Sequence, residues 1–337
     1  MRKGVCTYNK SVVRRKWRRH LISIKRRHKA YVPQFKYNTN PNVYSEEERF
    51  KLLECPVVFS TEKNLEGVIT YINKVRKVVK RYKALTVDLS KVEEIDMLAI
   101  VVLLSHIEYV AQRGVYVNGN YPINKDAYRK FVDSGFLALV QTLNDKKPGT
   151  REENSLIVDL GRQYYKSDAV AQVNEKALKL IKADSNIQLY QRLNGIVGEM
   201  GGNVIQYAYS DIKHYMYGYS YAEEENCIRF FFADAGYGIV QTLKRSFGQK
   251  FFDNLHIKGD VNVLNGAFRQ KYGSKTGDNN RHLGLPYILA TQNIGMISNL
   301  KVISNYAYLD FNDQTKSHKL SSHYAGTLYV WEINENN

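Results

Sequence analysis

Short apolar segments alternate with helical patterns through the first half of the chain, and this alternation limits the fold more than any other feature. Strands are predicted at 57–59, 85–89 and 115–117, and helices at 63–82, 97–112 and 125–132. Strands and helices that alternate along a chain form sheets covered by helices. The pattern therefore predicts the α/β class.

Two polar segments divide the chain. Turn-forming residues without periodicity fill 37–44, and the polar run NDKKPGTREEN follows Leu139. Such segments are typical of boundaries. We therefore predict an N-terminal arm and linker at 1–44, a first domain at 45–145 and a second domain at 150–337.

The second domain also carries alternating apolar patterns. Strands are predicted at 156–160, 227–233, 300–311 and 327–333, and helices at 170–181 and 188–208. The stretch 259–282 is rich in Gly, Asn, Lys and Ser, so it is predicted to be a mobile functional loop. A tyrosine cluster at 207–221 suits core packing, with base stacking as the alternative.

Most of the net charge of +16 lies in the arm, because Met1 to Lys36 holds 13 Lys and Arg and no acidic residue. Val13, Trp17 and Leu21 recur at helical spacing, which predicts a short basic amphipathic helix. The cations between Arg14 and Lys29 suit a nucleic-acid backbone. Docking of Trp17 on protein and binding to an anionic membrane are the alternatives.

The cysteines and the hydropathy pattern exclude several classes. The three cysteines lie far apart without Cys-x-x-Cys spacing, so neither a disulfide framework nor a zinc site is expected. No apolar run reaches the roughly 20 residues of a membrane-spanning helix. A cytoplasmic protein without a transmembrane segment is therefore expected.

Three separated segments in the second domain carry residues suited to chemistry. Glu199 and Asn203 lie one helical turn apart, where a carboxylate can orient water and an amide oxygen can ligate Mg²⁺. Asp234 ends an apolar strand and is followed by Gly236 and Gly238, which permit close backbone approach to a ring or phosphate. Gly284 opens a helix whose N-terminal amides suit a phosphate.

The order and spacing of these segments resemble the Bergerat-fold (GHKL) ATPases, the superfamily of gyrase, a heat-shock chaperone, histidine kinases and the mismatch-repair protein MutL. The likeness spans 188–331 and includes a Gly-Thr segment at Gly326 and Thr327. It implies an α/β sandwich domain that binds ATP and Mg²⁺.

The resemblance also implies roles for individual residues. Glu199 would be the general base and Asn203 the Mg²⁺ ligand, while Asp234 would accept a hydrogen bond from the adenine amine. The other nucleotide-binding residues that it implies are Gly236, Gly238, Gly284, Leu285 and Thr327. This chain lacks the run of glycines common before Gly284, and Lys275 or Arg281 is expected to neutralise phosphate charge instead.

In the first domain, the segment ALTVDLSKVEEID at 84–96 is followed by a helix, by Gly114 with the strand at 115–117, and by the segment FVDSGF at 131–136. This pattern resembles the STAS domain of anti-sigma factor antagonists over 55–139. The residue after Asp96 is Met97, where that family often has a phosphorylatable Ser. Phosphoryl switching at this position is therefore excluded, and a docking or dimerising role is expected.

These features predict a nucleotide-dependent switch that controls a protein or nucleic-acid interaction, with slow ATP hydrolysis. The expected partner is another protein or a second copy of the chain. The alternatives are a serine protein kinase of the anti-sigma factor type and a non-catalytic nucleic-acid-binding module with structural ATP. A histidine-kinase role is disfavoured because His106 lies in an apolar helix.

Overall fold

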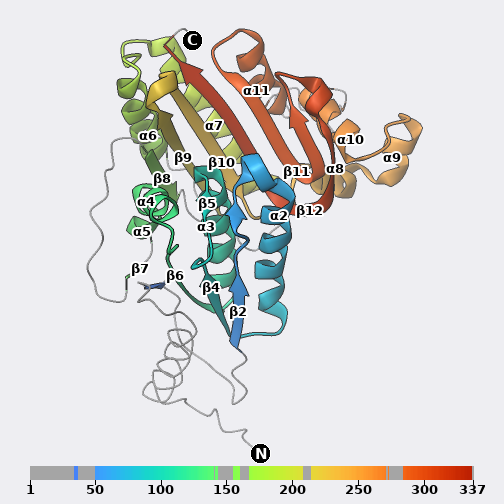
Figure 1. Cartoon of the computed structure of the whole chain (residues 1–337). Helices are drawn as coiled ribbons and strands as arrows, with labels where there is room; N and C mark the ends of the chain where they lie inside the picture. Colours follow the sequence, from blue (N-terminus) through green and yellow to red (C-terminus); the bar gives the residue numbers. More distant parts are fainter. Residues whose placement is uncertain are drawn as a thin grey trace, which may run out of the picture. The chain divides into compact units, whose positions relative to one another are not determined.

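The computed structural model describes residues 34–36, 50–139, 141–142, 155–159, 167–207, 214–270, 272 and 284–335. The predicted arm helix, the linker at 37–44, Lys275 and Arg281 lie outside these ranges. The chain divides into two compact units, each with its own sheet (Figure 1). Its parallel and antiparallel sheets and its helices confirm the α/β class.

The first unit contains a five-stranded sheet of order β2-β4-β6-β1-β7. Its strands are β2 (Phe50–Glu54), β4 (Ala84–Asp88), β6 (Tyr116–Asn120), β1 (Gln34–Lys36) and β7 (Gln141–Thr142). The first three are parallel, whereas β1 pairs antiparallel with both of its neighbours. All five residues of β4 are buried, as expected for a parallel strand covered on both faces.

The connections between these strands are largely helical. They comprise α2 (Thr61–Lys77), the 3-10 turn η1 (Val78–Lys80), α3 (Met97–Ala111), α4 (Lys125–Asp133) and α5 (Phe136–Leu139). The short strands β3 (Val58–Phe59) and β5 (Glu94–Ile95) form a separate parallel pair. The Ser60 hydroxyl accepts a hydrogen bond from the Lys63 N–H and so caps α2.

Part of the expected arm belongs to the first sheet. Gln34–Lys36 form β1 between β6 and β7, although the sequence placed them in a basic arm. A three-residue strand carries no periodicity of its own, and its hydrogen-bonding partners lie more than 80 residues away. Tertiary pairing alone therefore defines this strand.

The second unit contains an antiparallel sheet of order β11-β12-β10-β9-β8. Its strands are β8 (Ser155–Asp159), β9 (Tyr215–Ala222), β10 (Cys227–Asp234), β11 (Ser298–Asp310) and β12 (His318–Asn334). The helices α6 (Ser167–Leu180), α7 (Ile187–Tyr207) and α11 (Gly284–Asn293) pack against it (Figure 1). The 3-10 turns η2 (Glu223–Glu225) and η3 (Gln314–Lys316) connect neighbouring strands.

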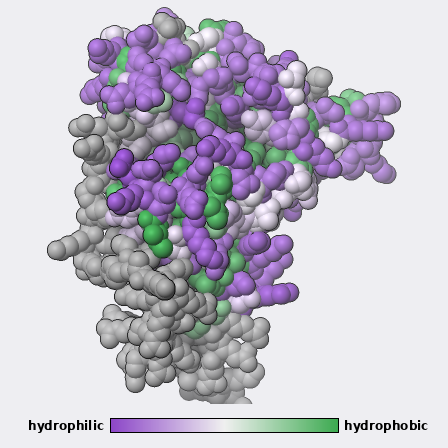
Figure 2. All heavy atoms as spheres, in the orientation of Figure 1, coloured by the Kyte–Doolittle hydropathy of each residue, from purple (hydrophilic) through white to green (hydrophobic). Residues whose placement is uncertain are grey.

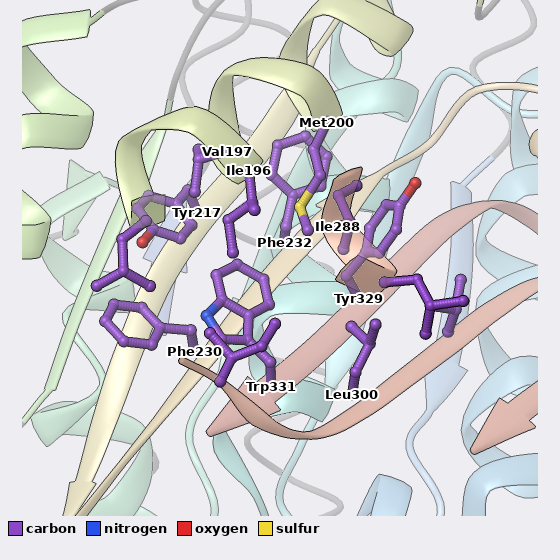
Figure 3. Packing of buried hydrophobic residues seen from close by; sticks show 14 of the residues in the cluster. Ile196, Val197, Met200, Tyr217, Phe230, Phe232, Ile288, Leu300, Tyr329 and Trp331 are labelled. Carbon is purple, nitrogen blue, oxygen red and sulfur yellow. The ribbon is translucent and has the colours of Figure 1, made fainter. Parts of the chain in front are cut away.

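One face of this sheet forms the core with α7. Alternate residues of β10 and β12, including Phe230, Phe232 and Trp331, are buried in one cluster (Figure 3). Ile196 and Met200 of α7 lie in the same cluster, and Met200 is next to Phe232. Because side chains alternate along a strand, the even residues of β10 face this helical layer.

Three tyrosines of the predicted cluster are part of the core. Tyr215, Tyr217 and Tyr219 are buried on β9 and face the same layer of side chains. Tyr217 stacks near Trp331, with ring centroids 6.0 Å apart. These three rings are packing residues and offer no exposed stacking surface for bases.

The prediction of a loop over 259–282 is wrong in its first part. Residues Asp260–Phe268 form α10, and Val263, Leu264 and Phe268 are buried in the core. The polar residues and glycines at 269–282 led to a loop prediction for the whole stretch and obscured the apolar face of this helix. The segment 273–283 lies outside the described residues.

Two further short helices, α8 (Ile239–Phe247) and α9 (Gln249–Asn254), follow β10 and were not predicted. Figure 2 shows hydrophilic residues over most of one face, with hydrophobic residues in small groups. Within the described ranges, no helix has the length and apolarity needed to span a bilayer.

Candidate functional site

Asp234 provides a carboxylate at the end of β10. Asp234 is separated from Phe232 and Phe230 by steps of two residues along β10. Because side chains alternate along a strand, its side chain is on the face of the sheet that carries α7. It is 4% exposed. Its Oδ1 accepts the Gly236 N–H at 2.7 Å and its Oδ2 accepts the Thr327 N–H at 3.0 Å.

These two hydrogen bonds fix the direction of the carboxylate. The buried hydroxyl of Tyr329 lies nearby, and its pKa is held far above its usual range by burial and then by the Asp234 charge. Asp234 is therefore a fixed acceptor in a poorly solvated place.

Two glycines allow the backbone to close around Asp234. A Cβ on Gly326 would lie 2.0 Å from the backbone oxygen of Asp234, and its φ is +130°. Gly238 has a φ of +82°. Any residue with a side chain would be strained at either position.

A second group of predicted residues meets where α7 lies beside the start of α11. A Cβ on Gly284 would lie 2.6 Å from Glu199 Oε2 and 3.6 Å from Asn203 Nδ2. Glu199 is exposed, whereas Asn203 is half-buried. The Nδ2 atom of Asn203 is buried and lacks a hydrogen-bond partner among the described residues.

The packing of α7 on α11 fixes this group. A Cβ on Gly195 would lie 2.7 Å from the Tyr287 hydroxyl, and the Arg192 guanidinium lies 4.3 Å from the centre of the same ring. Gly195 precedes Glu199 by one turn, whereas Tyr287 follows Gly284 by one turn. The two helices are therefore antiparallel here, and α11 begins beside the Glu199 carboxylate.

The structure brings the predicted residues together in two groups. The first contains Asp234, Gly236, Gly238 and Thr327, and the second contains Glu199, Asn203 and Gly284. Leu285 is half-buried and packs on the core cluster. Lys275 and Arg281 lie outside the described ranges.

Both groups belong to the same layer of the second unit. Met200 and Val204, the neighbours of Glu199 and Asn203 in α7, are buried in the cluster that contains Phe232. Phe232 is two residues before Asp234 on the same face of β10. The two groups thus flank one helix-covered face of the sheet.

The sequence did not single out Ser304 and Asn305. Both are buried on β11 and contact the turn after Asp234, where a Cβ on Gly238 would lie 2.7 Å from each side chain. No local sequence pattern predicts a functional role for them, because two adjacent polar residues within a long strand indicate only a break in its apolar pattern. The positive φ of Asn305, 57°, appears only in the folded chain.

Asn203 is compatible with a cation that also has other ligands. Within the described ranges, no group of three or more His, Cys, Asp and Glu residues is placed to hold a metal. Mg²⁺ commonly takes one or two protein oxygens and completes its shell with phosphates and water. The Nδ2 position of Asn203, which lacks a partner, lies close to the exposed Glu199 carboxylate. A flip of the amide would place its oxygen at this position, and an oxygen there fits such a site.

His106 and the buried cysteines do not contribute to these groups. His106 is fully buried within α3, which confirms a structural role. Cys55 and Cys227 are buried and free, and burial raises the pKa of the Cys227 thiol to about 11. A thiol with a raised pKa is a poor nucleophile at neutral pH.

Comparison with known proteins identifies no relative: no protein-family model, curated protein or solved structure matches this chain. Inference about its function therefore rests on the geometry of its own residues.

Proposed function

We propose that the second unit binds ATP with Mg²⁺ and acts as a nucleotide-dependent switch with slow ATP hydrolysis. The observation that carries this proposal is that four segments far apart in the chain supply the two groups. The segments contain Glu199 and Asn203, Asp234 to Gly238, Gly284, and Gly326 with Thr327. Within each group, residues that are distant in sequence are neighbours in space, and this supports the proposal.

Asp234 is the base-recognition residue in this proposal. An exocyclic amine is a donor, and Asp234 is a buried acceptor whose direction two backbone N–H groups fix. Gly238 and Gly326 let the backbone pack closely around Asp234, which holds the carboxylate in place for the base. Adenine presents such an amine, whereas guanine presents a carbonyl oxygen at the same ring position.

Asn203 and Glu199 are the phosphate-side residues. The Nδ2 position of Asn203 lacks a hydrogen-bond partner, and a flipped amide would offer its oxygen there to Mg²⁺. The bound cation would neutralise phosphate charge. The exposed Glu199 carboxylate would orient and deprotonate the attacking water. The N-terminal N–H groups of α11 would face phosphate oxygens.

The nucleotide would change the surface that a partner recognises. A ligand shifts such an equilibrium only by its difference in affinity for the two states, typically a few kcal/mol. The partner is proposed to be another protein, a second copy of this chain or a nucleic acid that contacts the arm. The first unit, proposed to be STAS-like, would serve as the docking element because Met97 cannot be phosphorylated.

The test is a titration of ATP with Mg²⁺ on the wild type and on Asp234→Asn. The amide would turn an N–H towards either Gly236 or Thr327, and we expect ATP affinity to fall at least tenfold. Asp310→Asn is the matched control. Asp310 also lies at a strand end, is 4% exposed and accepts the N–H groups of Asn312 and Asp313.

A phosphate-release assay then separates binding from turnover. Glu199→Ala should retain ATP binding and lose hydrolysis. Equal turnover in Glu199→Ala and the wild type would reject the general-base role. Equal ATP affinity in Asp234→Asn and Asp310→Asn would reject the whole site.

A further inference from the structure

The helix that follows the Asp234 turn is capped by residues from a distant strand. The Ile239 N–H donates to Ser304 Oγ at 2.7 Å, and the Gln241 N–H donates to Asn305 Oδ1 at 3.0 Å. The residue at the N-cap position of α8 is Gly238, which has no side chain to perform this role. Ser304 and Asn305 therefore satisfy the first N–H groups of α8 across more than 60 residues of sequence.

Asn305 also holds the turn from its other side. Its Nδ2 donates to the Tyr237 backbone oxygen at 2.7 Å, so one amide bridges Tyr237 and Gln241. The register of β11 against β12 shifts between Ser304 and Asn305. This irregularity and the left-handed backbone of Asn305 aim its side chain at the turn.

Gly238 fits into a socket formed by these side chains. A Cβ there would lie 2.7 Å from Asn305 Oδ1, Ser304 Oγ and the Gly326 backbone oxygen. The Ser304 hydroxyl is itself 3.3 Å from that Gly326 oxygen. The socket thus connects the turn after Asp234 with the segment that supplies the Thr327 N–H.

The three strands align the socket with Asp234. Thr327 is the register partner of Asp234 on β10 and of Ser304 on β11. Asp234 and Ser304 are in phase with core residues such as Phe232 and Val302, so they occupy the same face of the sheet. Displacing β11 at this point would therefore move both N–H donors of Asp234.

We infer that Ser304 and Asn305 are positioning residues for base recognition. They hold the 235–238 turn and the Gly326–Thr327 backbone so that the Asp234 carboxylate points at the exocyclic amine of the base. This inference rests on the proposed function, because it assigns these residues to the ATP site. Neither side chain needs to touch the nucleotide.

The test compares Asn305→Gly with Asn299→Gly. Both asparagines are on β11 with positive φ, 57° and 52°, and glycine accepts either conformation. The Asn299 amide instead donates to Glu332, which is paired with Ser298 at the other end of the strand. Ser304→Ala is the second test variant, because it removes a single hydroxyl.

Amide hydrogen exchange without nucleotide measures positioning directly. The Gly236 and Thr327 amides bond to Asp234 and not to Asn305, so a local loss of the Asn305 contacts alone would leave them protected. We expect both amides to exchange at least tenfold faster in Asn305→Gly and to stay unchanged in Asn299→Gly. Unchanged exchange of these amides in Asn305→Gly and Ser304→Ala would overturn the inference.

Base discrimination links positioning to function. Inosine triphosphate carries a carbonyl oxygen in place of the adenine amine, so the ratio of its Kd to that of ATP reports on Asp234. We expect this ratio to fall about fivefold in Asn305→Gly and Ser304→Ala and to remain constant in Asn299→Gly. If the variants are less stable but the ratio of the two Kd values is unchanged, Ser304 and Asn305 have only a structural role. If the wild type binds no ATP, the proposed function fails, while the exchange experiment still decides the positioning.

Discussion

At the scale of single residues, Gly284 is where the helix α11 meets the proposed general base. A Cβ at this position would come within 2.6 Å of Glu199 Oε2, which is the end of an exposed and flexible side chain. Such a side chain moves at little cost to folding. Its displacement would matter for a reaction that depends on the position of the carboxylate.

We therefore predict that Gly284→Ala lowers ATP turnover by about two orders of magnitude while changing the free energy of unfolding by less than about 1 kcal/mol. ATP affinity should fall much less than turnover. The measurements are phosphate release, ATP titration and urea unfolding.

Gly202→Ala is the matched control for Gly284→Ala. Gly202 also lies in a helix of this pair, and a Cβ there would meet nothing within 4 Å. This change should leave turnover intact and stabilise α7 by up to about 1 kcal/mol. Wild-type turnover in Gly284→Ala would contradict the placement of Glu199 as the base.

At the scale of elements, the contact between β12 and the end of β10 depends on Gly326. A Cβ there would lie 2.0 Å from the Asp234 backbone oxygen, and backbone cannot move aside as a side chain can. Its φ of +130° is also unfavourable for other residues. This glycine therefore allows two strands and a turn to meet.

Gly326→Ala should reduce the free energy of unfolding by roughly 3 kcal/mol or more, since steric overlap adds to backbone strain. Gly295→Ala is the comparison, because Gly295 has a φ of +77° but open space around its Cβ position. There we expect a loss of about 1 kcal/mol from strain alone. Urea unfolding followed by circular dichroism measures both, and equal losses would show that the close approach is unimportant.

At the scale of the whole molecule, the basic arm and the proposed ATP site are expected to work separately. Met1 to Lys36 contains 13 basic residues, and excluding Lys36 leaves 12 before β1. Removing residues 1–33 should abolish salt-sensitive retention on duplex DNA while ATP affinity stays unchanged. A fluorescence titration at two salt concentrations measures the first effect.

The comparison truncation removes residues 1–36 and with them β1. Gln34–Lys36 lie between β6 and β7, so their loss should lower the stability of the first sheet in addition. If the protein without residues 1–33 still binds DNA with the same salt dependence, another part of the chain is responsible for that binding.

Much of the architecture could be predicted from periodicity. The helices at α3, α4 and α7 and the strands at β4 and β10 begin and end within a few residues of their predicted bounds. Their apolar residues repeat at the spacing of one face, which is a local property of the sequence. Helix α10 was missed because it is short and its nine residues were grouped with the polar, glycine-containing residues that follow it.

The sequence by itself determined the α/β class and singled out the residues that are proposed to bind a nucleotide, because hydrophobic periodicity and motif spacing depend only on the order of residues. The tertiary structure decided which of them meet: Gly284 beside Glu199, and Thr327 beside Asp234. It also decided the roles of β1 and of Ser304 and Asn305, since pairing across a sheet joins residues that no local pattern connects.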